Sequence, residues 1–291
     1  MKVSFIIPSV DRTNQLLSCI NSIEIAKDRQ KDVEVEIIVV YNGEGYNNQP
    51  LKIKKPATVK YFNIKVKGPS KARNYGITKS SGDYLMFLDD DASVSEDFLE
   101  KLFINMRNDV NIYFARLLNP SDKLPFTGIY CDTKMKYLNF FDYSYAGGTT
   151  MTIKRETLFK IGQFDDRFGS ADKYRGAEEG DLFFRLLQNR EKILYLPDLI
   201  IFHAIDKETS PGKVFDYAYS VGALLMKQIL ADWRRFYVYS FIFFMIVFKS
   251  LLRSAQVYIF PNSVKGENRR YQYFSVFQGT VSGFMSYYRN E

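Results

Sequence analysis

Short apolar runs alternate with helix-like patterns over the first 110 residues of the chain. Runs rich in Val, Ile, Leu and Phe predict strands at residues 3–10, 33–41, 59–64 and 84–88. Between them, apolar residues at helical spacing predict a helix over residues 12–26 and a short one over residues 70–80. Strands this apolar, alternating with helices, indicate a mostly parallel sheet covered on both faces. Ligands of such sheets bind outside the carboxyl ends of the strands.

The pattern becomes less regular after residue 110. A strand at 111–118 and a long aromatic loop at 119–146 precede GGTTMTIKRETLFKIG, which predicts a Gly turn, a strand and a short helix. GAEEGDLFFRLLQN predicts a helix whose first turn holds acidic residues, where they suit the helix dipole. Two short strands, KILYLP and LIIFH, follow. We therefore expect an α/β domain over residues 1–215, with halves at 1–110 and 111–215, and a helical region over residues 216–291.

The composition excludes several classes of protein. With 46% hydrophobic residues and only 9 prolines in 291 residues, the chain suits a packed globular protein, not a disordered one. Cys19 and Cys131 are the only cysteines, which excludes a disulfide framework and a zinc-type cysteine cluster. The first apolar stretch ends at Pro8 and is too short for a secretory signal, so we expect a cytoplasmic location.

Three consecutive aspartates, Asp89–Asp91, follow the apolar run YLMFL. Like charges this close resist being ionised together, so the cluster needs a reason. A solvated loop is one reason. A cap for the next helix is another, although Ser93 and Glu96 already form the S-x-x-E pattern of a capping box. A third is a divalent cation, since hard cations take oxygen ligands and relieve the repulsion. The spacing alone leaves all three open.

The net charge of +7 is concentrated in the C-terminal tail. Residues 227–291 hold 9 Lys and Arg against 3 Asp and Glu, whereas residues 1–226 hold 31 against 30. Residues 236–248 are uncharged, lie between basic residues, and are fewer than the roughly 20 that a spanning helix needs.

Two interpretations of this tail stay open. One is a helix buried against the preceding domain. The other is a helix in the plane of an anionic membrane, supported by the basic and aromatic sequence NRRYQYF at 268–274. In the second case we expect residues 227–291 to bind membranes and to take no part in chemistry. Nothing resembles a nucleic-acid-binding fold, so no nucleic-acid partner is expected.

Four motifs, IIPSVDR, GPSKARNYG, FLDDDAS and GAEEGDLFFRL, stand in this order before the single histidine in LIIFHAID. Together they resemble the family 2 glycosyltransferases of the GT-A fold, over residues 1–205, about 70% of the chain. The resemblance implies a Rossmann-like, mostly parallel sheet flanked by helices, here followed by an amphipathic helical appendage. It implies a nucleotide-sugar site made of Pro8, Ser9, Asp11, Arg12, Asn42, Lys71, Arg73, Asn74, Asp89 and Asp90.

The resemblance also implies a divalent cation, Mn²⁺ or Mg²⁺, that bridges the donor diphosphate. Asp91 and His203 match the family's ligands for this cation, and Asp89 is expected to reach the ribose. Where the family commonly has an aspartate that binds the nucleotide base, this chain has Tyr41 and Asn42. A UDP-sugar is the favoured donor, and dTDP- and GDP-sugars stay open.

The acceptor side of the resemblance begins at the Gly-rich turn of Gly147 and Gly148, and Asp181 is placed with it. EEGDLFFR resembles the family's E-D motif, whose second acid is the catalytic base. This assigns the base to Glu179. Glutamate has a longer arm than aspartate, so Glu178 stays an alternative.

The function implied is an inverting, metal-dependent transfer of a sugar to a hydroxyl of a glycan or lipid-linked glycan, in surface polysaccharide or glycoconjugate synthesis. The enzyme is expected on the inner face of the cell membrane. The alternative is a catalytically silent subunit that binds sugar nucleotides and scaffolds a glycan assembly complex. A nucleotidyltransferase is disfavoured, because PSVDRTNQ lacks the glycine-rich loop that such an enzyme needs after its first strand.

Overall fold

The computed structural model of the protein describes residues 1–10, 13–42, 59–125, 128–204, 210–259 and 267–290. Its internal contacts divide the chain into two compact units. The sheet unit comprises Met1–Phe164 and Arg185–Ile205, and the helical unit comprises Asp165–Phe184 and Asp206–Glu291. The expected boundary between residues 215 and 216 lies inside a helix of the second unit and stays a prediction.

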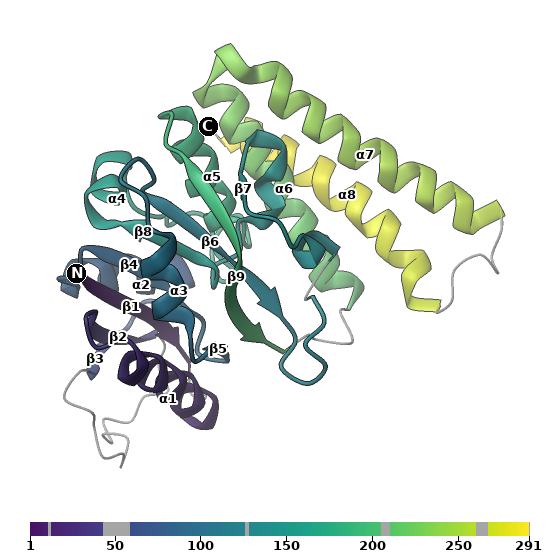
Figure 1. Ribbon diagram of the computed structural model, residues 1–291. Helices are drawn as coiled ribbons and strands as arrows, with labels where there is room; N and C mark the ends of the chain where they lie inside the picture. The colour runs from purple at the N-terminus through teal and green to yellow at the C-terminus, as the bar shows by residue number, and fades with distance from the viewer. Residues whose placement is uncertain (11–12, 43–58, 126–127, 205–209, 260–266, 291) are drawn as a thin grey trace. The chain divides into compact units, whose positions relative to one another are not determined.

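The sheet unit is built on a nine-stranded mixed sheet (Figure 1). The first four strands run parallel in the order β3-β2-β1-β4 and are β1 (Lys2–Ser9), β2 (Glu34–Asn42), β3 (Val59–Ile64) and β4 (Tyr84–Phe87). The order then continues through β8 (Met151–Lys154), β6 (Ile112–Leu118), β9 (Ile193–His203) and β5 (Ala92–Val94). The short strand β7 (Lys136–Tyr137) pairs with β9. The mixed α/β architecture expected from the apolar runs is confirmed.

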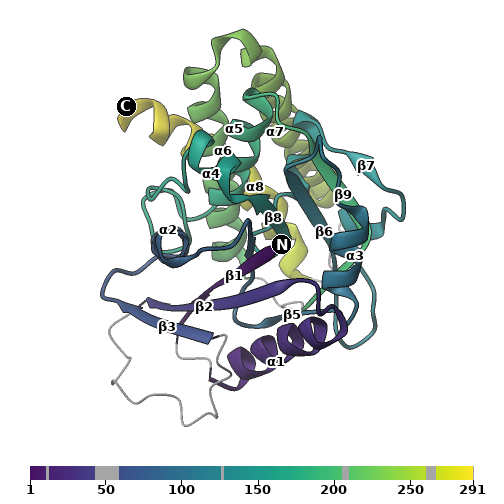
Figure 2. The same cartoon turned by 60° about the vertical axis from the view of Figure 1, so that its left-hand side comes forward.

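Helices cover both faces of the parallel half of this sheet, as Figure 2 shows. The helices α1 (Thr13–Arg29) and α3 (Phe98–Asn105) lie on one face, and α2 (Pro69–Lys79) lies on the other. The connections β1-α1-β2 and β3-α2-β4 step across the sheet in opposite directions. Because such crossovers are right-handed, the two helices must fall on opposite faces.

The parallel strands carry the core of the sheet unit. Phe5, Ile6 and Ile38 are fully buried between the helices. Gly76 allows α2 to approach β1, because a Cβ at this position would lie 2.5 Å from Cγ2 of Ile6. The glycine of the ARNYG motif therefore has a packing role.

One carboxylate is buried in this sheet. Glu36 accepts hydrogen bonds from the hydroxyl groups of Ser4 and Ser81 and from the Lys60 ammonium, at 2.6, 3.0 and 2.9 Å. Burial alone would raise the pKa of Glu36, but these donors outweigh it and lower the pKa from 4.5 to about 2. The charge is held in place by its hydrogen bonds.

Two local expectations are wrong. Ser93 does not begin a capping box, because it lies in β5, and α3 begins only at Phe98 without a side-chain cap. KILYLP and LIIFH are not two strands but the single strand β9. The register with β6 shifts between Leu196 and Ile200, next to Pro197, which has no N–H to donate to the ladder.

The stretch 119–146 is more ordered than a loop. It contains β7 and two 3-10 helices, η1 (Gly128–Cys131) and η2 (Phe140–Tyr145). The next segment is as expected, with β8 followed by the helix α4 (Arg155–Ile161), which ends at Gly162. Gly162 has φ +93°, a conformation that favours glycine.

The helical unit contains the start of α5 (Glu178–Gln188), α6 (Pro211–Ala231), η3 (Trp233–Arg235), α7 (Phe236–Ile259) and α8 (Glu267–Asn290). Glycines allow the backbones of α6 and α8 to touch. A Cβ at Gly222 would lie 2.0 Å from the carbonyl oxygen of Thr280, and Cβ atoms at Gly279 and Gly283 would lie 2.5 and 1.9 Å from carbonyl oxygens of α6. Helix α7 packs against both of these helices.

Helix α7 is longer than its uncharged core suggested. With η3 it forms a 27-residue stretch, Trp233–Ile259, that is long and apolar enough to cross a membrane, with a mean hydropathy of 1.6. Only 22% of that stretch's most apolar window is buried in the structure. It is the one such helix in the described part of the chain.

Candidate active site

The carboxyl ends of β1, β2 and β4 bring three predicted segments to one edge of the sheet unit (Figure 1). Strand β1 ends at Ser9, β2 ends at Asn42, and Asp89–Asp91 follow β4. Asp90 is buried and accepts hydrogen bonds from the Ser9 hydroxyl at 2.7 Å and from the Val10 N–H at 3.4 Å. Asp90 thus connects the aspartate cluster to Ser9 and Val10 at the end of β1.

Asp91 and His203 meet because β5 pairs antiparallel with the end of β9. Ala92 lies opposite His203 in this pairing, which places the preceding aspartate beside the imidazole. Asp91 Oδ1 lies 3.1 Å from His203 Nε2. Burial lowers the pKa of His203, but the hydrogen bond and charge of Asp91 outweigh it, so the pKa of His203 is raised from its ordinary value. Two predicted metal ligands therefore share one corner.

Asp91 and His203 together offer two protein ligands of kinds that a divalent cation accepts. Among the described residues, no three His, Cys, Asp or Glu side chains form a group that could hold a metal ion. Mg²⁺ in nucleotide sites commonly takes one or two carboxylates from the protein and the rest from phosphates and water. Asp91 and His203 offer one carboxylate and one imidazole, each partly exposed. The donor set suits Mn²⁺ or Mg²⁺ together with a diphosphate.

Asp89 pairs with a buried arginine. Arg73 Nη2 donates to Asp89 Oδ1 at 3.1 Å, and the guanidinium lies over the ring of Phe164, 5.5 Å from its centre. The Arg73 side chain is only 3% exposed, whereas that of Asp89 is 37% exposed. The buried Arg73 therefore orients Asp89, and Asp89 is the member of the pair that a ligand can reach.

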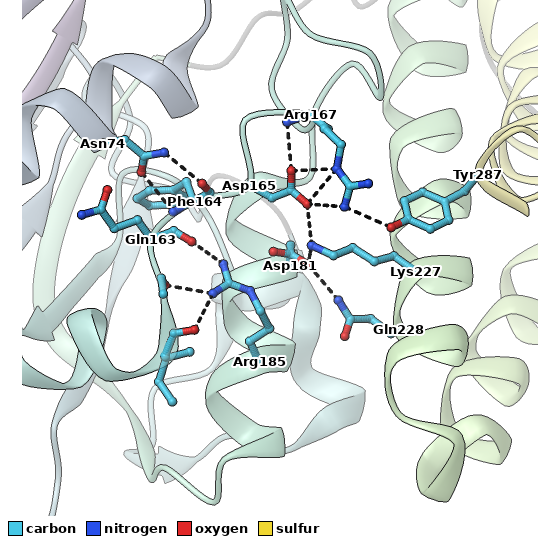
Figure 3. A network of polar contacts seen from close by, with 12 residues as sticks. Asn74, Gln163, Phe164, Asp165, Arg167, Asp181, Arg185, Lys227, Gln228 and Tyr287 are labelled. Carbon is cyan, nitrogen blue, oxygen red and sulfur yellow. Dashed lines mark hydrogen bonds and ion pairs between the residues drawn. The ribbon is translucent and has the colours of Figure 1, made fainter. Parts of the chain in front are cut away.

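Asn74, the next residue of ARNYG, braces the backbone. Its Nδ2 donates to the carbonyl oxygen of Phe164 at 2.9 Å, and its Oδ1 accepts from the N–H of the same residue at 3.0 Å (Figure 3). Asn74 thus fixes the position of Phe164.

Lys71, another predicted nucleotide-sugar contact, is partly exposed and donates to the carbonyl oxygen of Lys67 at 3.4 Å.

Asn42, a predicted nucleotide contact, is the last residue of β2. Its side chain is buried, and its Oδ1 has no hydrogen-bond partner among the residues that the structure describes. A buried acceptor without a donor is unfavourable until a ligand supplies one. Pro8 is partly exposed in β1. The predicted contacts Asp11 and Arg12 lie outside the described residues.

The predicted acceptor segment reaches the aspartate cluster through a residue that the sequence reading missed. Gly147 and Gly148 lead into Thr149, whose Oγ1 accepts a hydrogen bond from the Asp89 N–H at 3.3 Å. A Cβ at Gly147 would lie 3.1 Å from the Tyr130 hydroxyl. The Gly-rich turn is therefore closely packed beside Asp89.

The predicted base belongs to the helical unit, at the start of α5. Glu178 is buried and Glu179 is partly exposed. The two residues before them adopt positive φ angles, +146° at Gly176 and +65° at Ala177. Positive φ is costly for alanine and is often found at functional turns.

Asp181, predicted on the acceptor side, is fully buried in a polar network of the helical unit (Figure 3). The Lys227 ammonium lies 2.5 Å from Asp181 Oδ1, and Gln228 Nε2 donates to the same oxygen at 2.9 Å. The sequence reading missed both partners, because it treated residue 227 as the first residue of a membrane-binding tail.

Comparison with known proteins bears on the family. The family model described as "Glycosyl transferase family 2" matches residues 4–158. An "uncharacterized glycosyltransferase" of Rickettsia bellii is 36% identical over 116 residues, which cover 39% of this chain but 16% of that protein. Another from Haemophilus influenzae is 32% identical over 156 residues, 49% of this chain and 56% of that protein. The matched segments thus span less than two thirds of these relatives.

Two solved structures share the fold. S. aureus TarS 1-349 in complex with UDP-GlcNAc is 15% identical with a TM-score of 0.63, covering 100% of this chain and 93% of that one. The mannosyltransferase PcManGT from Pyrobaculum calidifontis, in complex with GDP-Man and Mn²⁺, is 14% identical with a TM-score of 0.67, covering 99% and 87%. The expected GT-A fold is confirmed. With more than half of its length matched by the family model, the chain belongs to glycosyl transferase family 2.

Proposed function

We propose that the protein is a metal-dependent glycosyltransferase that moves a sugar from a nucleotide diphosphate sugar to a hydroxyl group, with inversion at the anomeric carbon. The observation that carries this proposal is the Asp91–His203 pair, 3.1 Å apart at the carboxyl edge of the sheet. Family membership supports the reaction class. The pair supplies the protein's share of a cation site that a donor diphosphate completes.

The donor is a nucleotide diphosphate sugar, with UDP favoured. Asp89, oriented by Arg73, binds the ribose, and Asn42 uses its unpartnered Oδ1 to accept a hydrogen bond from the base. Pro8, Ser9, Asp11 and Arg12 complete the nucleoside side by family resemblance. The two structural neighbours were solved with UDP-GlcNAc and with GDP-Man, so a GDP-sugar is the competing donor.

Sugar transfer requires stabilisation of the leaving diphosphate and removal of a proton from the acceptor hydroxyl. Asp91 and His203 would hold a divalent cation, which would stabilise the negative charge of the departing diphosphate. The acceptor hydroxyl must lose a proton as it attacks, and Glu179 accepts that proton, with Glu178 as the alternative base. One displacement inverts the anomeric centre, so no enzyme nucleophile is needed.

The acceptor is a glycan or a lipid-linked glycan, and the C-terminal region binds the membrane that carries it. Seven of the exposed apolar residues of η3 and α7 fall on one helix face, most of them three or four residues apart: Trp233, Tyr237, Phe241, Phe244, Phe248, Leu251 and Leu252. We call these seven residues the α7 stripe. The opposite face, with Val238, Tyr239 and Ile242, is buried against its neighbours.

We propose that this helix lies in the plane of the membrane, with its exposed apolar face in the headgroup region. Between Trp233 and Ile259 there are four basic residues (Arg234, Arg235, Lys249 and Arg253) and no acidic ones. Each basic residue near an anionic surface contributes about 1 kcal/mol. The same charges would repel a second copy of the helix, so an anionic bilayer is the favoured partner.

The test of the catalytic proposal is a panel of nucleotide sugars incubated with the full chain and Mn²⁺, with nucleotide release as the readout. Release from one nucleotide class that stops on chelation supports the proposal. Tight binding of UDP without any turnover, with any donor and acceptor, supports the silent scaffolding subunit instead.

A further inference from the structure

One face of α6 packs against the segment that precedes and begins α5, the helix that holds the candidate base. Five α6 residues touch this segment, and their spacing of four, four, three and one places them on a single helix face: Asp216, Ser220, Leu224, Lys227 and Gln228. Their partners all lie between residues 165 and 181, within the helical unit. Figure 3 shows the end of this face with its polar contacts.

The contacts follow the chain from the turn into α5. Arg175 pairs with Asp216 at 2.5 Å. A Cβ at Gly176 would lie 3.3 Å from the Ser220 hydroxyl, and one at Gly180 would lie 2.8 Å from a methyl group of Leu224. The turn has no room to move toward α6, so α6 sets the position of the first turn of α5.

Lys227 provides the charged end of this contact. Its ammonium lies 2.5 Å from Asp181 Oδ1 and 2.7 Å from Asp165 Oδ2. Asp181 is 0% exposed, Asp165 is 16% exposed and Lys227 is 14% exposed. Two carboxylates on separate segments, one fully buried and one partly exposed, therefore converge on the Lys227 ammonium, and a bridge of this kind restricts both segments at once.

Asp165, the second carboxylate bound by Lys227, connects the network to α8 through Arg167. Arg167 donates to both oxygens of Asp165 and to the Tyr287 hydroxyl, the latter at 3.2 Å. Burial would raise the pKa of Asp165, but the hydrogen bonds from Arg167 and Lys227 outweigh it and hold this pKa well below its ordinary value. Residues from α5, α6, α8 and the 165–167 segment thus form one connected polar core.

We infer that Lys227 is a positioning residue for the first turn of α5, which carries Glu178 and Glu179. This inference rests on the proposed function, because it matters for the reaction only if that turn supplies the base. Arg175 and Ala177 give the turn a reason to need such support, because both adopt positive φ angles, which in non-glycine residues persist only where the surroundings enforce them. The C-terminal helices would then support the proposed base in addition to their proposed membrane contact.

The experiment compares three variants of the full chain: Lys227→Met, Lys227→Arg and Leu225→Ala. Lys227→Met removes the ammonium while keeping an unbranched side chain, and Lys227→Arg keeps the positive charge. Leu225 is fully buried on another face of α6 and forms no part of the polar network. Leu225→Ala therefore destabilises the same helix without removing a partner of Asp181. Turnover, donor KM and UDP affinity are measured at a temperature where circular dichroism shows each variant folded.

We expect Lys227→Met to lower kcat on the order of 100-fold, the size of effect that an ångström-scale misplacement of a reacting group produces. Donor KM and UDP affinity should stay within about twofold, because the proposed donor contacts belong to the sheet unit. Lys227→Arg should recover most of kcat, and Leu225→Ala should keep it. Unchanged kcat in Lys227→Met, or an equal loss in Leu225→Ala, would overturn the inference.

If Lys227→Met does not fold, Gln228→Leu carries the test, because it removes the second donor to Asp181 without removing a charge. A loss of kcat on the order of tenfold with unchanged donor KM is expected there, and unchanged kcat overturns the inference. Glu179→Gln and Glu178→Gln, measured alongside, distinguish a failure of the proposed base from a failure of the inference about Lys227. If both retain full turnover, the proposed base is wrong and the inference fails with it. If either loses turnover while Lys227→Met does not, only the inference fails.

Discussion

Asp91 Oδ1 lies 3.1 Å from His203 Nε2, although one residue follows β4 and the other ends β9, more than 100 residues later in the chain. The contact exists because the three-residue strand β5 pairs with the last residues of β9. A carboxylate and an imidazole that face each other at a strand edge can hold a cation between them.

The first prediction concerns this pair. Asp91→Asn and His203→Ala should each reduce sugar transfer at least about 100-fold and weaken Mn²⁺ binding, since each removes one of two protein ligands. Metal binding is measured by titration calorimetry in the presence of UDP. Asp109→Asn is the matched control, because Asp109 is an exposed carboxylate that pairs with Lys192 away from this edge. Retention of Mn²⁺ affinity in both variants would contradict the assignment.

The second prediction separates the two candidate bases. Glu179→Gln nearly keeps the side-chain shape but cannot accept a proton, so UDP affinity should persist while transfer falls by about 100-fold or more. Glu178→Gln should retain most of the transfer. If the losses are reversed, the base is the buried Glu178 and the family motif is aligned one residue too late.

The third prediction concerns Asn74, which the family resemblance placed at the nucleotide. Its side chain makes two hydrogen bonds to the backbone of Phe164, so Asn74→Ala leaves a buried N–H and C=O without these partners. We expect a loss of about 1–3 kcal/mol in the free energy of unfolding, measured by urea denaturation. Wild-type stability together with a raised donor KM would show instead that Asn74 acts mainly on the ligand.

The fourth prediction concerns acid stability. The pKa of Glu36 is about 2 in the folded protein against an ordinary value of 4.5. A lowered folded-state pKa contributes stability that is complete above about pH 4.5 and is lost as the pH falls toward 2. Glu36→Gln should therefore lower the free energy of unfolding by at most about 3 kcal/mol at pH 7, and the difference should shrink below pH 4.5. An equal difference at pH 7 and pH 3 would contradict this account.

The fifth prediction concerns the α7 stripe. The triple variant Phe241→Ser, Phe244→Ser, Phe248→Ser should no longer float with anionic vesicles, because it removes exposed aromatic side chains that insert into the headgroup region. The control changes Phe103, Phe141 and Phe159 to serine, three exposed phenylalanines of the sheet unit. Light scattering of the wild type and both variants, without vesicles, detects the competing outcome. In that outcome the wild type and the control variant are dimers, and the stripe variant is a monomer.

A truncation after residue 226 is not a clean test of this anchor. Such a cut falls inside α6, which extends to Ala231, and it removes Lys227 and Gln228 from the network around Asp181. Flotation of the full chain is therefore the suitable measurement.

The parallel half of the sheet could be predicted from the sequence, because its strands are continuous apolar runs and its helices have clear apolar spacing. The strand β5 could not, since Ala92–Val94 is too short to show a period. Its pairing with β9 is a long-range contact, and only the family resemblance suggested that Asp91 and His203 meet. Strand β9 was divided in two because Pro197 normally interrupts a strand, whereas here the ladder with β6 shifts register around it.

The helical unit could be predicted least. The reading of the tail rested on its charge and its apolar residues, and neither property shows that Lys227 binds Asp181. One usable signal was present: Gly279 and Gly283 are four residues apart, a spacing typical of helices that pack closely. That signal would have indicated that the helix carrying these glycines packs closely against another helix.

Metal-dependent turnover of a nucleotide sugar tests the central claim most directly. Full-length protein and the Asp91→Asn variant are incubated with UDP-GlcNAc, other UDP-sugars and GDP-mannose, with Mn²⁺ or with chelator, and nucleotide release is followed. We predict release from one nucleotide class by the wild type, its loss on chelation, its recovery with excess Mn²⁺, and none from Asp91→Asn. Release that is unaffected by chelator and by Asp91→Asn would contradict the account.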